Sequence, residues 1–138
     1  MNLTLIARIV LGLIFTVFGL NGFLNFLPAP DLPGGAGEFI GALLGSGYFF
    51  PFLKLTETVC GLLLLTNRMV PLALTILAPV VLNIILFHIF LASAPEAIAV
   101  PILTVVLLVY LAYSYRSYFA GVLTVNATPD TTREKVAA

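Results

Sequence analysis

Apolar residues dominate four long stretches of the chain, and shorter polar stretches separate them. The apolar stretches are residues 3–27, 49–66, 70–92 and 97–115. Each has roughly 18–25 residues, and a helix that rises ~1.5 Å per residue needs about 20 residues to cross a ~30 Å hydrocarbon layer. Backbone amides in lipid must be hydrogen-bonded internally, which these non-alternating stretches can achieve only as helices. The pattern predicts an all-α bundle of four transmembrane helices.

The composition agrees with this pattern. Hydrophobic residues make up 61% of the 138 residues and charged residues only 9%, whereas soluble domains contain ~25% charged residues. So few polar groups cannot form an ordinary aqueous surface. We expect a single membrane domain at residues 1–119, followed by a disordered cytoplasmic tail at residues 120–138.

The first apolar stretch also has one feature of a secretory signal, because Arg8 precedes the apolar residues 9–20. The apolar character nevertheless continues to Leu27, no Ala-x-Ala cleavage pattern follows, and three more apolar stretches come later in the chain. We therefore interpret this stretch as an uncleaved first transmembrane helix.

Charged residues are distributed unequally between the connections. The connections after the first and third stretches carry acidic residues alone, which are Asp31, Glu38 and Glu96. Basic residues lie near the opposite ends of the stretches or after the fourth, and they are Arg8, Arg68, Arg116, Arg133 and Lys135. By the positive-inside rule, this asymmetry predicts that both termini are cytoplasmic and that the acidic connections are external.

The first external connection contains a predicted element of its own. Gly37, Gly41 and Gly45 recur at every fourth residue beside apolar residues, a pattern typical of a short amphipathic helix with a stripe of small residues. Such a helix would cover the outer end of its own bundle or pack tightly against another helix. We favour a lid on its own bundle, and contact with a neighbouring protomer stays open.

Two opposite charges lie inside the second apolar stretch. Lys54 and Glu57 are three residues apart, and at ~100° per residue they share one helix sector with Thr58 and Gly61. Exposing such charges to lipid costs roughly 2.5–3.5 kcal/mol each on insertion scales, so this sector should face the bundle interior. An ionisable residue inside a span is a functional hypothesis by default.

Other polar residues lie at similar depths in the predicted helices. Counting from the ends of the stretches places Glu57 and Asn83 near the midplane, and Lys54 about one turn further out, at the depth of Asn21. His88 lies slightly further out still, and a helical wheel turns it about 140° away from Asn83. We expect a polar chamber in the outer half of the bundle, walled by Phe residues, with Lys54, Glu57, Asn83 and Asn21 as its members.

The charge pair has two interpretations that the sequence leaves open. It is either an internal salt bridge that fixes helix packing, or a ligand site that orients a polar headgroup, a quinone-like carbonyl or a proton in transit. His88 and Arg8 are further candidates for ligand binding. Arg8 shares a stripe with Gly12 and Gly19, and it either extends to the interface while the glycines permit close helix contact, or faces inward as a partner of Glu57.

Several chemistries lack the residues they need. A single Cys cannot form an intramolecular disulfide relay, and a single His cannot supply two axial haem ligands. No group of residues has the spacing of a metal site, a nucleotide-binding loop or a nucleic-acid surface. We therefore expect no catalytic residues, metal, haem or nucleic-acid partner in this chain. Any electrons must be carried by another subunit or by a lipid-soluble carrier.

The chain resembles the DoxX family of small four-helix bacterial membrane proteins over about residues 3–119. The matching positions are Ala7, Arg8 and Ile9 with Gly12 and Gly19; Gly47 and Tyr48 leading to Pro51, Lys54 and Glu57; residues 61–65 ending at Asn67 and Arg68; and Asn83 with Phe87 and His88. The resemblance implies a multi-pass protein of the bacterial cytoplasmic (inner) membrane that is associated with redox systems.

These observations lead to two functional hypotheses of different classes. The first is an accessory subunit of a quinone-linked or otherwise redox-associated membrane system, with a bound quinone or lipid, a redox-enzyme partner subunit, and no stand-alone catalysis. The second is a lipid or small-molecule binding or transport protein that uses the intramembrane chamber. A purely structural scaffold is a third possibility, and the oligomeric state is open.

Overall fold

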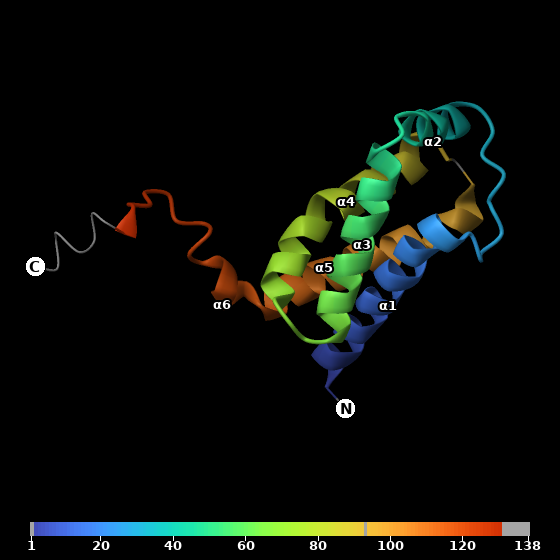
Figure 1. Cartoon of the computed structure of the whole chain (residues 1–138). Helices are drawn as coiled ribbons and strands as arrows, with labels where there is room; N and C mark the ends of the chain where they lie inside the picture. The colour runs from blue at the N-terminus through green and yellow to red at the C-terminus, as the bar shows by residue number, and fades with distance from the viewer. Residues whose placement is uncertain (1, 93, 131–138) are drawn as a thin grey trace, which may run out of the picture.

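The computed structural model describes residues 2–92 and 94–130. Within these residues the chain is helical and contains no strand (Figure 1). The elements in chain order are α1 (Leu3–Leu24), α2 (Gly35–Gly45), α3 (Phe49–Leu65), α4 (Val70–Phe90), the 3-10 turn η1 (Pro95–Ala97), α5 (Ala99–Ser114) and α6 (Arg116–Phe119). The prediction of an all-α fold is confirmed.

The helix ends follow local sequence signals. α1 begins where the Asn2 side chain accepts a hydrogen bond from the Thr4 amide at 3.1 Å, and it ends at Asn25, which adopts a left-handed conformation with φ 49°. An Asn at this position commonly terminates a helix. The helix is therefore three residues shorter than the first apolar stretch. α4 begins after the left-handed Met69, with Pro71 in its first turn, where the missing amide proton costs little.

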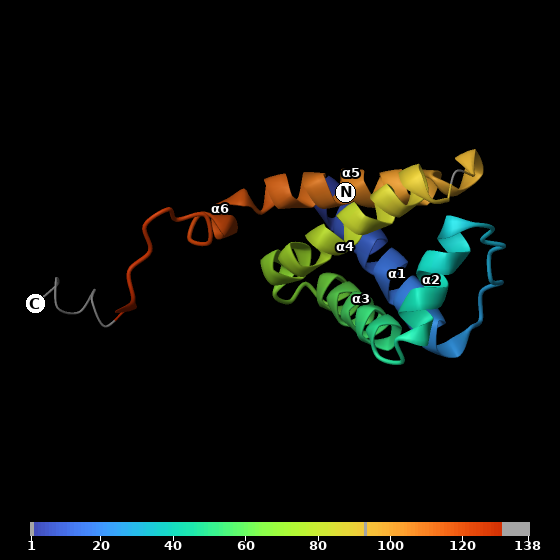
Figure 2. The ribbon, with the colours of Figure 1, turned by 90° about the horizontal axis from the view of Figure 1, so that it is seen from above.

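Four helices pack around one core. α1 packs against α3 and α5, and α4 packs against the same two helices, with α3 and α5 on opposite sides when the bundle is seen from above (Figure 2). The buried core residues are Ala7, Leu11 and Phe15 of α1, Cys60 and Leu64 of α3, Val70, Ala73, Leu74, Leu77 and Val81 of α4, and Leu108 and Leu111 of α5. Most of these lie toward the end of the bundle that contains the α3–α4 turn, so this end is closed by packing.

Glycines allow α1 and α3 to approach very closely. A Cβ atom added to Gly12 would lie 3.0 Å from the carbonyl oxygen of Gly61, and one added to Gly61 would lie 2.6 Å from the Thr16 amide nitrogen. A Cβ atom on Gly19 would lie 2.7 Å from the Thr58 amide nitrogen. Small residues at such positions are how helices in membranes bring their backbones together. The expectation that the α1 glycines permit close helix contact is confirmed.

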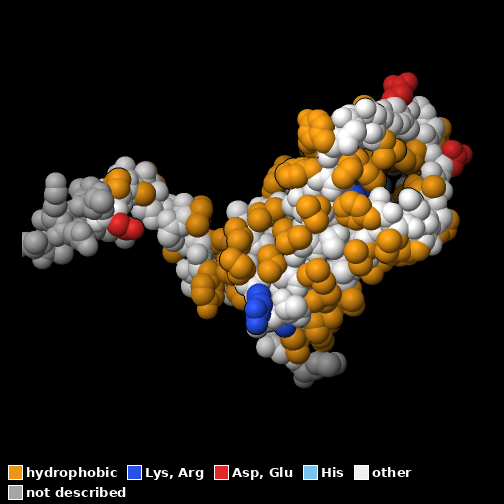
Figure 3. Space-filling view, in the orientation of Figure 1, with side chains coloured by type: hydrophobic (Ala, Val, Ile, Leu, Met, Phe, Trp, Pro, Cys, Tyr) orange, Lys and Arg blue, Asp and Glu red, His pale blue; other side chains and the backbone are white. Residues whose placement is uncertain are grey.

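The helices differ in their suitability as membrane spans. α1, α4 and the segment Pro95–Ser114 are long and apolar enough to cross a bilayer. α3 has 17 residues and qualifies only together with α2, from which it is bent by 92°. The described residues therefore contain three candidate spans, or up to four if this bent pair counts as one. Large apolar side chains cover the outside of the bundle, as Figure 3 shows, which suits contact with lipid.

The predicted short helix in the first connection is present as α2 and lies across one end of the bundle (Figure 1). Ala36 is buried against the bundle, and the Phe39 ring lies 5.7 Å from that of Phe87 on α4. Gly41 and Gly45 have open space where a Cβ atom would be. The glycine stripe therefore does not pack against another helix of this chain, and the apolar side of α2 faces its own bundle.

After α5 the chain continues as the short helix α6, and residues 120–129 contain neither helix nor strand. Arg116 donates a hydrogen bond to the carbonyl oxygen of Tyr113 at 3.0 Å, and its guanidinium lies over the Tyr113 ring. The predicted disordered tail includes residues 131–138, with Arg133 and Lys135, and these lie outside the described residues.

Candidate functional site

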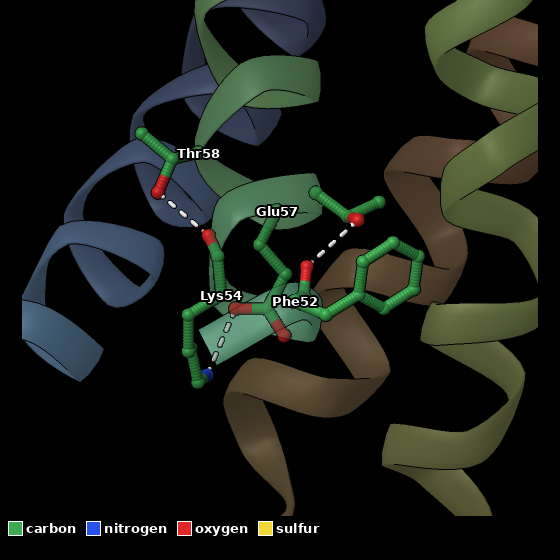
Figure 4. A network of polar contacts seen from close by, with 5 residues as sticks. Phe52, Lys54, Glu57 and Thr58 are labelled. Atoms are coloured by element: carbon green, nitrogen blue, oxygen red, sulfur yellow. Dashed lines mark hydrogen bonds and ion pairs between the residues drawn. The ribbon is translucent and has the colours of Figure 1, made fainter. Parts of the chain in front are cut away.

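Lys54 and Glu57 of α3 form an ion pair that faces the other helices. Lys54 Nζ lies 2.9 Å from Glu57 Oε2, and Glu57 is only 3% exposed (Figure 4). The Lys54 side chain is 19% exposed, so the ammonium lies nearer the surface than the carboxylate. The Phe50 ring centroid is 5.6 Å from Nζ and adds a cation–π contact. Both charges are thus turned away from the outer apolar surface of the bundle.

The polar sector of α3 divides into two parts. Thr58 and Gly61 face α1, where Thr58 packs against Gly19 and its hydroxyl donates to the Lys54 carbonyl at 2.7 Å (Figure 4). Lys54 packs its aliphatic stem against Gly22 of α1, and both Lys54 and Glu57 also border an open space. The helical wheel grouped all four residues correctly on the inner side of α3, but only the charge pair is available to a ligand.

A cavity of about 370 Å³, here called the inner cavity, lies beside Glu57. Its lining comes from all four bundle helices, α2 and η1, and consists of Ile14, Phe15, Phe18, Phe39, Ile40, Leu43, Phe50, Leu53, Lys54, Glu57, Asn83, Ile84, Phe87, His88, Ala97, Val100, Pro101 and Thr104. Glu57 and Thr104 are buried, whereas Asn83 and Val100 are exposed. The cavity therefore extends from an exposed rim to a buried base that contains a carboxylate.

The inner cavity lies toward the end of the bundle opposite the packed core, as the predicted chamber did, and Phe15 borders both. Its walls are mainly apolar, with polar groups at Lys54, Glu57, Asn83, His88 and Thr104 alone. Ligand sites commonly combine apolar walls with a few well-placed polar groups. The expectation of Phe walls is confirmed, and Phe and aliphatic side chains from all six lining elements leave the chamber less polar than expected.

His88 lines the inner cavity together with Asn83, although the helical wheel separated them. The cavity wall follows α4 across Asn83, Ile84, Phe87 and His88, an arc of about 140°. The His88 Nδ1 atom lies 2.8 Å from the carbonyl oxygen of Ile84. A carbonyl oxygen only accepts, so Nδ1 carries the proton and Nε2 of the neutral ring is an acceptor. The prediction that His88 points away from the chamber is wrong, because the wall wraps around α4.

Asn21 does not line the inner cavity. Its side-chain oxygen accepts a hydrogen bond from the Leu27 amide at 2.7 Å, which stabilises the turn after α1. Asn21 instead lines a larger neighbouring cavity of about 970 Å³, here called the outer cavity, between the 25–33 loop, α2 and η1. The assignment of Asn21 to the chamber beside Glu57 is corrected accordingly.

Arg8 lines neither cavity, and the structure agrees with neither interpretation of it. The side chain is buried, at 7% exposure, so it does not extend to the interface. Its guanidinium donates to the backbone carbonyls of Leu64 and Leu65 at the end of α3, while the ion-pair partner of Glu57 is Lys54. The last carbonyls of a helix have no intrahelical donor. Arg8 supplies donors to these carbonyls and joins α1 to the end of α3.

Two parts of the site were absent from the sequence prediction. The apolar side of α2 provides Phe39, Ile40 and Leu43, and the buried Thr104 of α5 donates its hydroxyl to Pro101 at 2.7 Å, which leaves the oxygen lone pairs as acceptors. The sequence does contain one indication of Thr104 as a polar group of the site, because it is a lone Thr three residues after a proline in an apolar span. The sequence favoured α2 as a lid on its own bundle, but nothing local indicates that Phe39 meets Phe87 of α4.

Within the part of the chain that the structure describes, no three His, Cys, Asp or Glu residues lie together in a way that could hold a metal ion. Cys60, the lone cysteine, is buried in the core and lines neither cavity.

Long apolar helices around a partly buried charge pair define an integral membrane protein of the helical class. The DoxX family model matches residues 3–90, so the chain belongs to the DoxX family. The match covers α1 to α4 and ends before η1 and α5, which is a shorter region than the resemblance over residues 3–119 suggested. No curated protein and no solved structure matches the chain.

Proposed function

We propose that this DoxX protein binds a small, mainly apolar molecule with a carbonyl group, such as a quinone, and serves as an accessory subunit of a quinone-linked membrane system. The observation that carries the proposal is the Lys54–Glu57 ion pair in the wall of an apolar cavity of about 370 Å³. Cavities of roughly 300–1,000 Å³ are typical of small-molecule sites. This volume suits one ring-bearing headgroup.

The polar groups of the inner cavity suit a neutral ligand with acceptor atoms. Lys54 has three N–H donors, of which one is directed to Glu57, and the Asn83 amide adds two more. Aromatic rings of Phe18, Phe50 and Phe87 line the same space and would stack on a planar ring. Electron transfer itself is assigned to a partner subunit, since the chain contains one Cys and one His.

Measuring the quinone bound to the purified protein tests this proposal directly. The full-length protein is purified in a mild detergent, extracted with organic solvent, and its quinone content is compared between the wild type, Glu57→Gln and Lys54→Met. Glu38→Gln is the matched control, because Glu38 is an exposed carboxylate on α2 that lines neither cavity. Retention in the wild type and in Glu38→Gln, with loss in both site variants, supports the proposal. A wild type that never retains quinone contradicts it.

A second candidate function is binding or transport of a membrane lipid, and the neighbouring outer cavity favours it. At about 970 Å³ this cavity is large enough for part of an acyl chain. Mass spectrometry of lipids retained by the protein in native nanodiscs separates the two functions. A specific non-quinone lipid that is lost in Lys54→Met favours lipid binding. A purely structural scaffold would lose stability in the variants without losing any bound molecule.

We further propose a location and topology: the bacterial cytoplasmic membrane, four crossings with α3 as the second, a single domain at residues 1–119, and cytoplasmic termini. Acidic side chains gather at the α2 end of the bundle and basic ones at the opposite end (Figure 3), as Glu38 on α2 and Arg68 in the α3–α4 turn illustrate. The positive-inside rule makes the Arg68 end cytoplasmic.

Cysteine labelling in intact cells tests the topology. Because Cys60 is buried, a membrane-impermeant maleimide should label an added cysteine without background from this residue. We expect Ala42→Cys on α2 to be labelled in intact cells, and Asn67→Cys in the α3–α4 turn to be labelled only after lysis. The reverse pattern contradicts the proposed orientation.

A further inference from the structure

The inner and outer cavities meet at a shared set of side chains. Seven residues line both, and they are Phe18, Ile40, Phe50, Lys54, Phe87, His88 and Ala97. The shared set contains the only lysine and the only histidine of either lining. Both side chains therefore border the inner cavity on one side and the outer cavity on the other.

The charges along the two cavities are unbalanced. The inner cavity contains Lys54 and Glu57, and the outer cavity adds Asp31 and Glu96, so one basic side chain is accompanied by three acidic ones. With a neutral His88 this gives a formal charge of −2 along the combined lining. Asp31 and Glu96 are both exposed and lie at the external-loop end of the bundle.

We infer that the two cavities form one continuous site, in which the outer cavity is the access route and selects neutral, carbonyl-bearing molecules over anions. This inference rests on the proposed function. An anionic molecule approaching from the loops meets the Asp31 and Glu96 carboxylates before it reaches Lys54, and Lys54 is already neutralised by Glu57 at 2.9 Å. A cationic molecule would be attracted by the acidic residues, but it would lose its hydration among the apolar walls of the inner cavity, where the one carboxylate, Glu57, is already paired with Lys54.

A neutral molecule meets neither the repulsion of an anion nor the cost of burying a charge. Its apolar body can contact Phe18, Phe50 and Phe87, which line the junction, while an acceptor oxygen reaches the free N–H groups of Lys54. The remainder of a molecule too large for the inner cavity can occupy the outer one. The ligand class is therefore a neutral ring with a carbonyl acceptor and an apolar substituent that extends toward the loops.

A pair of probes that differ in charge tests the selection. The full-length protein in a non-ionic detergent is dialysed against 2-methyl-1,4-naphthoquinone, which is neutral, or 1,4-naphthoquinone-2-sulfonate, which is anionic. Salt partly screens the repulsion between the exposed carboxylates and an anion, so the effect should be moderate. We expect the wild type to bind the neutral probe roughly fivefold more tightly than the anionic one. Equal binding, or a preference for the sulfonate, overturns the inference.

Removing the two acidic side chains should abolish the selection. In the double variant Asp31→Asn with Glu96→Gln, we expect the ratio of the two affinities to fall close to one while the affinity for the neutral probe is unchanged. Glu38→Gln, which removes an exposed carboxylate outside both linings, should retain the wild-type ratio. A double variant with the wild-type ratio overturns the inference and leaves the proposed function standing. If neither probe binds to the wild type, the proposed function fails as well.

Ala97 offers a test of the access route, since it lines both cavities and is exposed. Ala97→Phe should narrow the junction and slow the association of the neutral probe, whereas Ala42→Phe, an exposed position on α2 outside both linings, should not. Melting temperatures of both variants show whether they are folded. A folded Ala97→Phe protein with unchanged association kinetics overturns the access route, and the charge variants test the inference independently if Ala97→Phe does not fold.

Discussion

Gly19 of α1 lies directly against Thr58 of α3, so closely that a Cβ atom on the glycine would collide with the threonine hydroxyl and lie 2.7 Å from its amide nitrogen. This contact fixes the rotation of α3 about its own axis. With Thr58 and Gly61 against α1, the neighbouring Lys54 and Glu57 are directed into the inner cavity. The position of the charge pair therefore depends on the glycines of a different helix.

Gly19→Ala should destabilise the bundle, because the added methyl group meets the α3 backbone and cannot be accommodated by a side-chain rotation. Overpacking of this kind costs about 1–3 kcal/mol. The measurement is thermal unfolding in detergent, followed by circular dichroism. Gly41→Ala is the matched control. The added Cβ atom has open space there, and replacing a helical glycine by alanine stabilises the folded protein by about 0.5–1 kcal/mol. An equally stable Gly19→Ala protein would contradict the close packing.

Lys54→Met should destabilise the protein more than Glu57→Gln. The lysine variant leaves a carboxylate that is 3% exposed without its ion-pair partner, which costs about 3 kcal/mol or more, whereas the glutamine variant leaves a lysine that is 19% exposed and can reach the outer cavity. Unfolding of both single variants and of the double variant forms a mutant cycle. We expect the double variant to be more stable than Lys54→Met alone, and strict additivity would show that the pair does not interact.

Arg8→Met should destabilise the junction of α1 with the end of α3. The variant removes the charged donor from the Leu64 and Leu65 carbonyls and leaves the Leu64 carbonyl with the Asn67 amide at 3.3 Å; hydrogen bonds to charged groups are worth about 1.5–3 kcal/mol. Arg116→Met is the matched control, since Arg116 also donates to a carbonyl near a helix end but is exposed, and surface changes are usually within about 0.5 kcal/mol. Equal melting temperatures of the two variants would argue against the structural role of Arg8.

Phe39→Ala should loosen α2 from the rest of the bundle. The Phe39 ring lies 5.7 Å from the Phe87 ring and lines the inner cavity, so its removal takes away an aromatic pair worth about 0.5–1.5 kcal/mol beyond the apolar area it buries. Hydrogen exchange should become faster in the α2 amides and stay unchanged in α1. Leu44→Ala removes an exposed side chain from the same helix and should leave exchange as it is. Unchanged protection of α2 in Phe39→Ala would contradict its role as a lid.

The sequence predicted the elements well because their signals are local. The apolar stretches became α1, α3, α4 and α5, with ends displaced by up to three residues, as where the left-handed Asn25 stops α1. The inward orientation of Lys54 and Glu57 followed from the energy of charges in lipid. Family membership also followed from the residues at these positions, and the DoxX match confirms it.

The members of the candidate site were harder to predict. Asn21 was assigned to the chamber from its depth alone, but its side chain instead binds the Leu27 amide six residues later in the chain. Arg8 was weighed as a partner of Glu57 or of the interface, and it binds carbonyls at the end of α3. Depth and helical angle predict only the point at which a side chain leaves its helix. The partner that a long side chain binds depends on which groups lie within its reach.

By itself, the sequence determined that this protein is helical, belongs to the membrane and has two opposite charges that must avoid lipid, since hydrophobic length and the energy of buried charge are properties of short segments. Tertiary structure alone decided that Phe39 of α2 meets Phe87 of α4, that the cavity is mainly apolar, and that Lys54 and His88 lie where two cavities meet. Those features depend on how closely the glycine faces of α1 and α3 approach and how the loops return the chain, which are contacts between residues far apart in sequence.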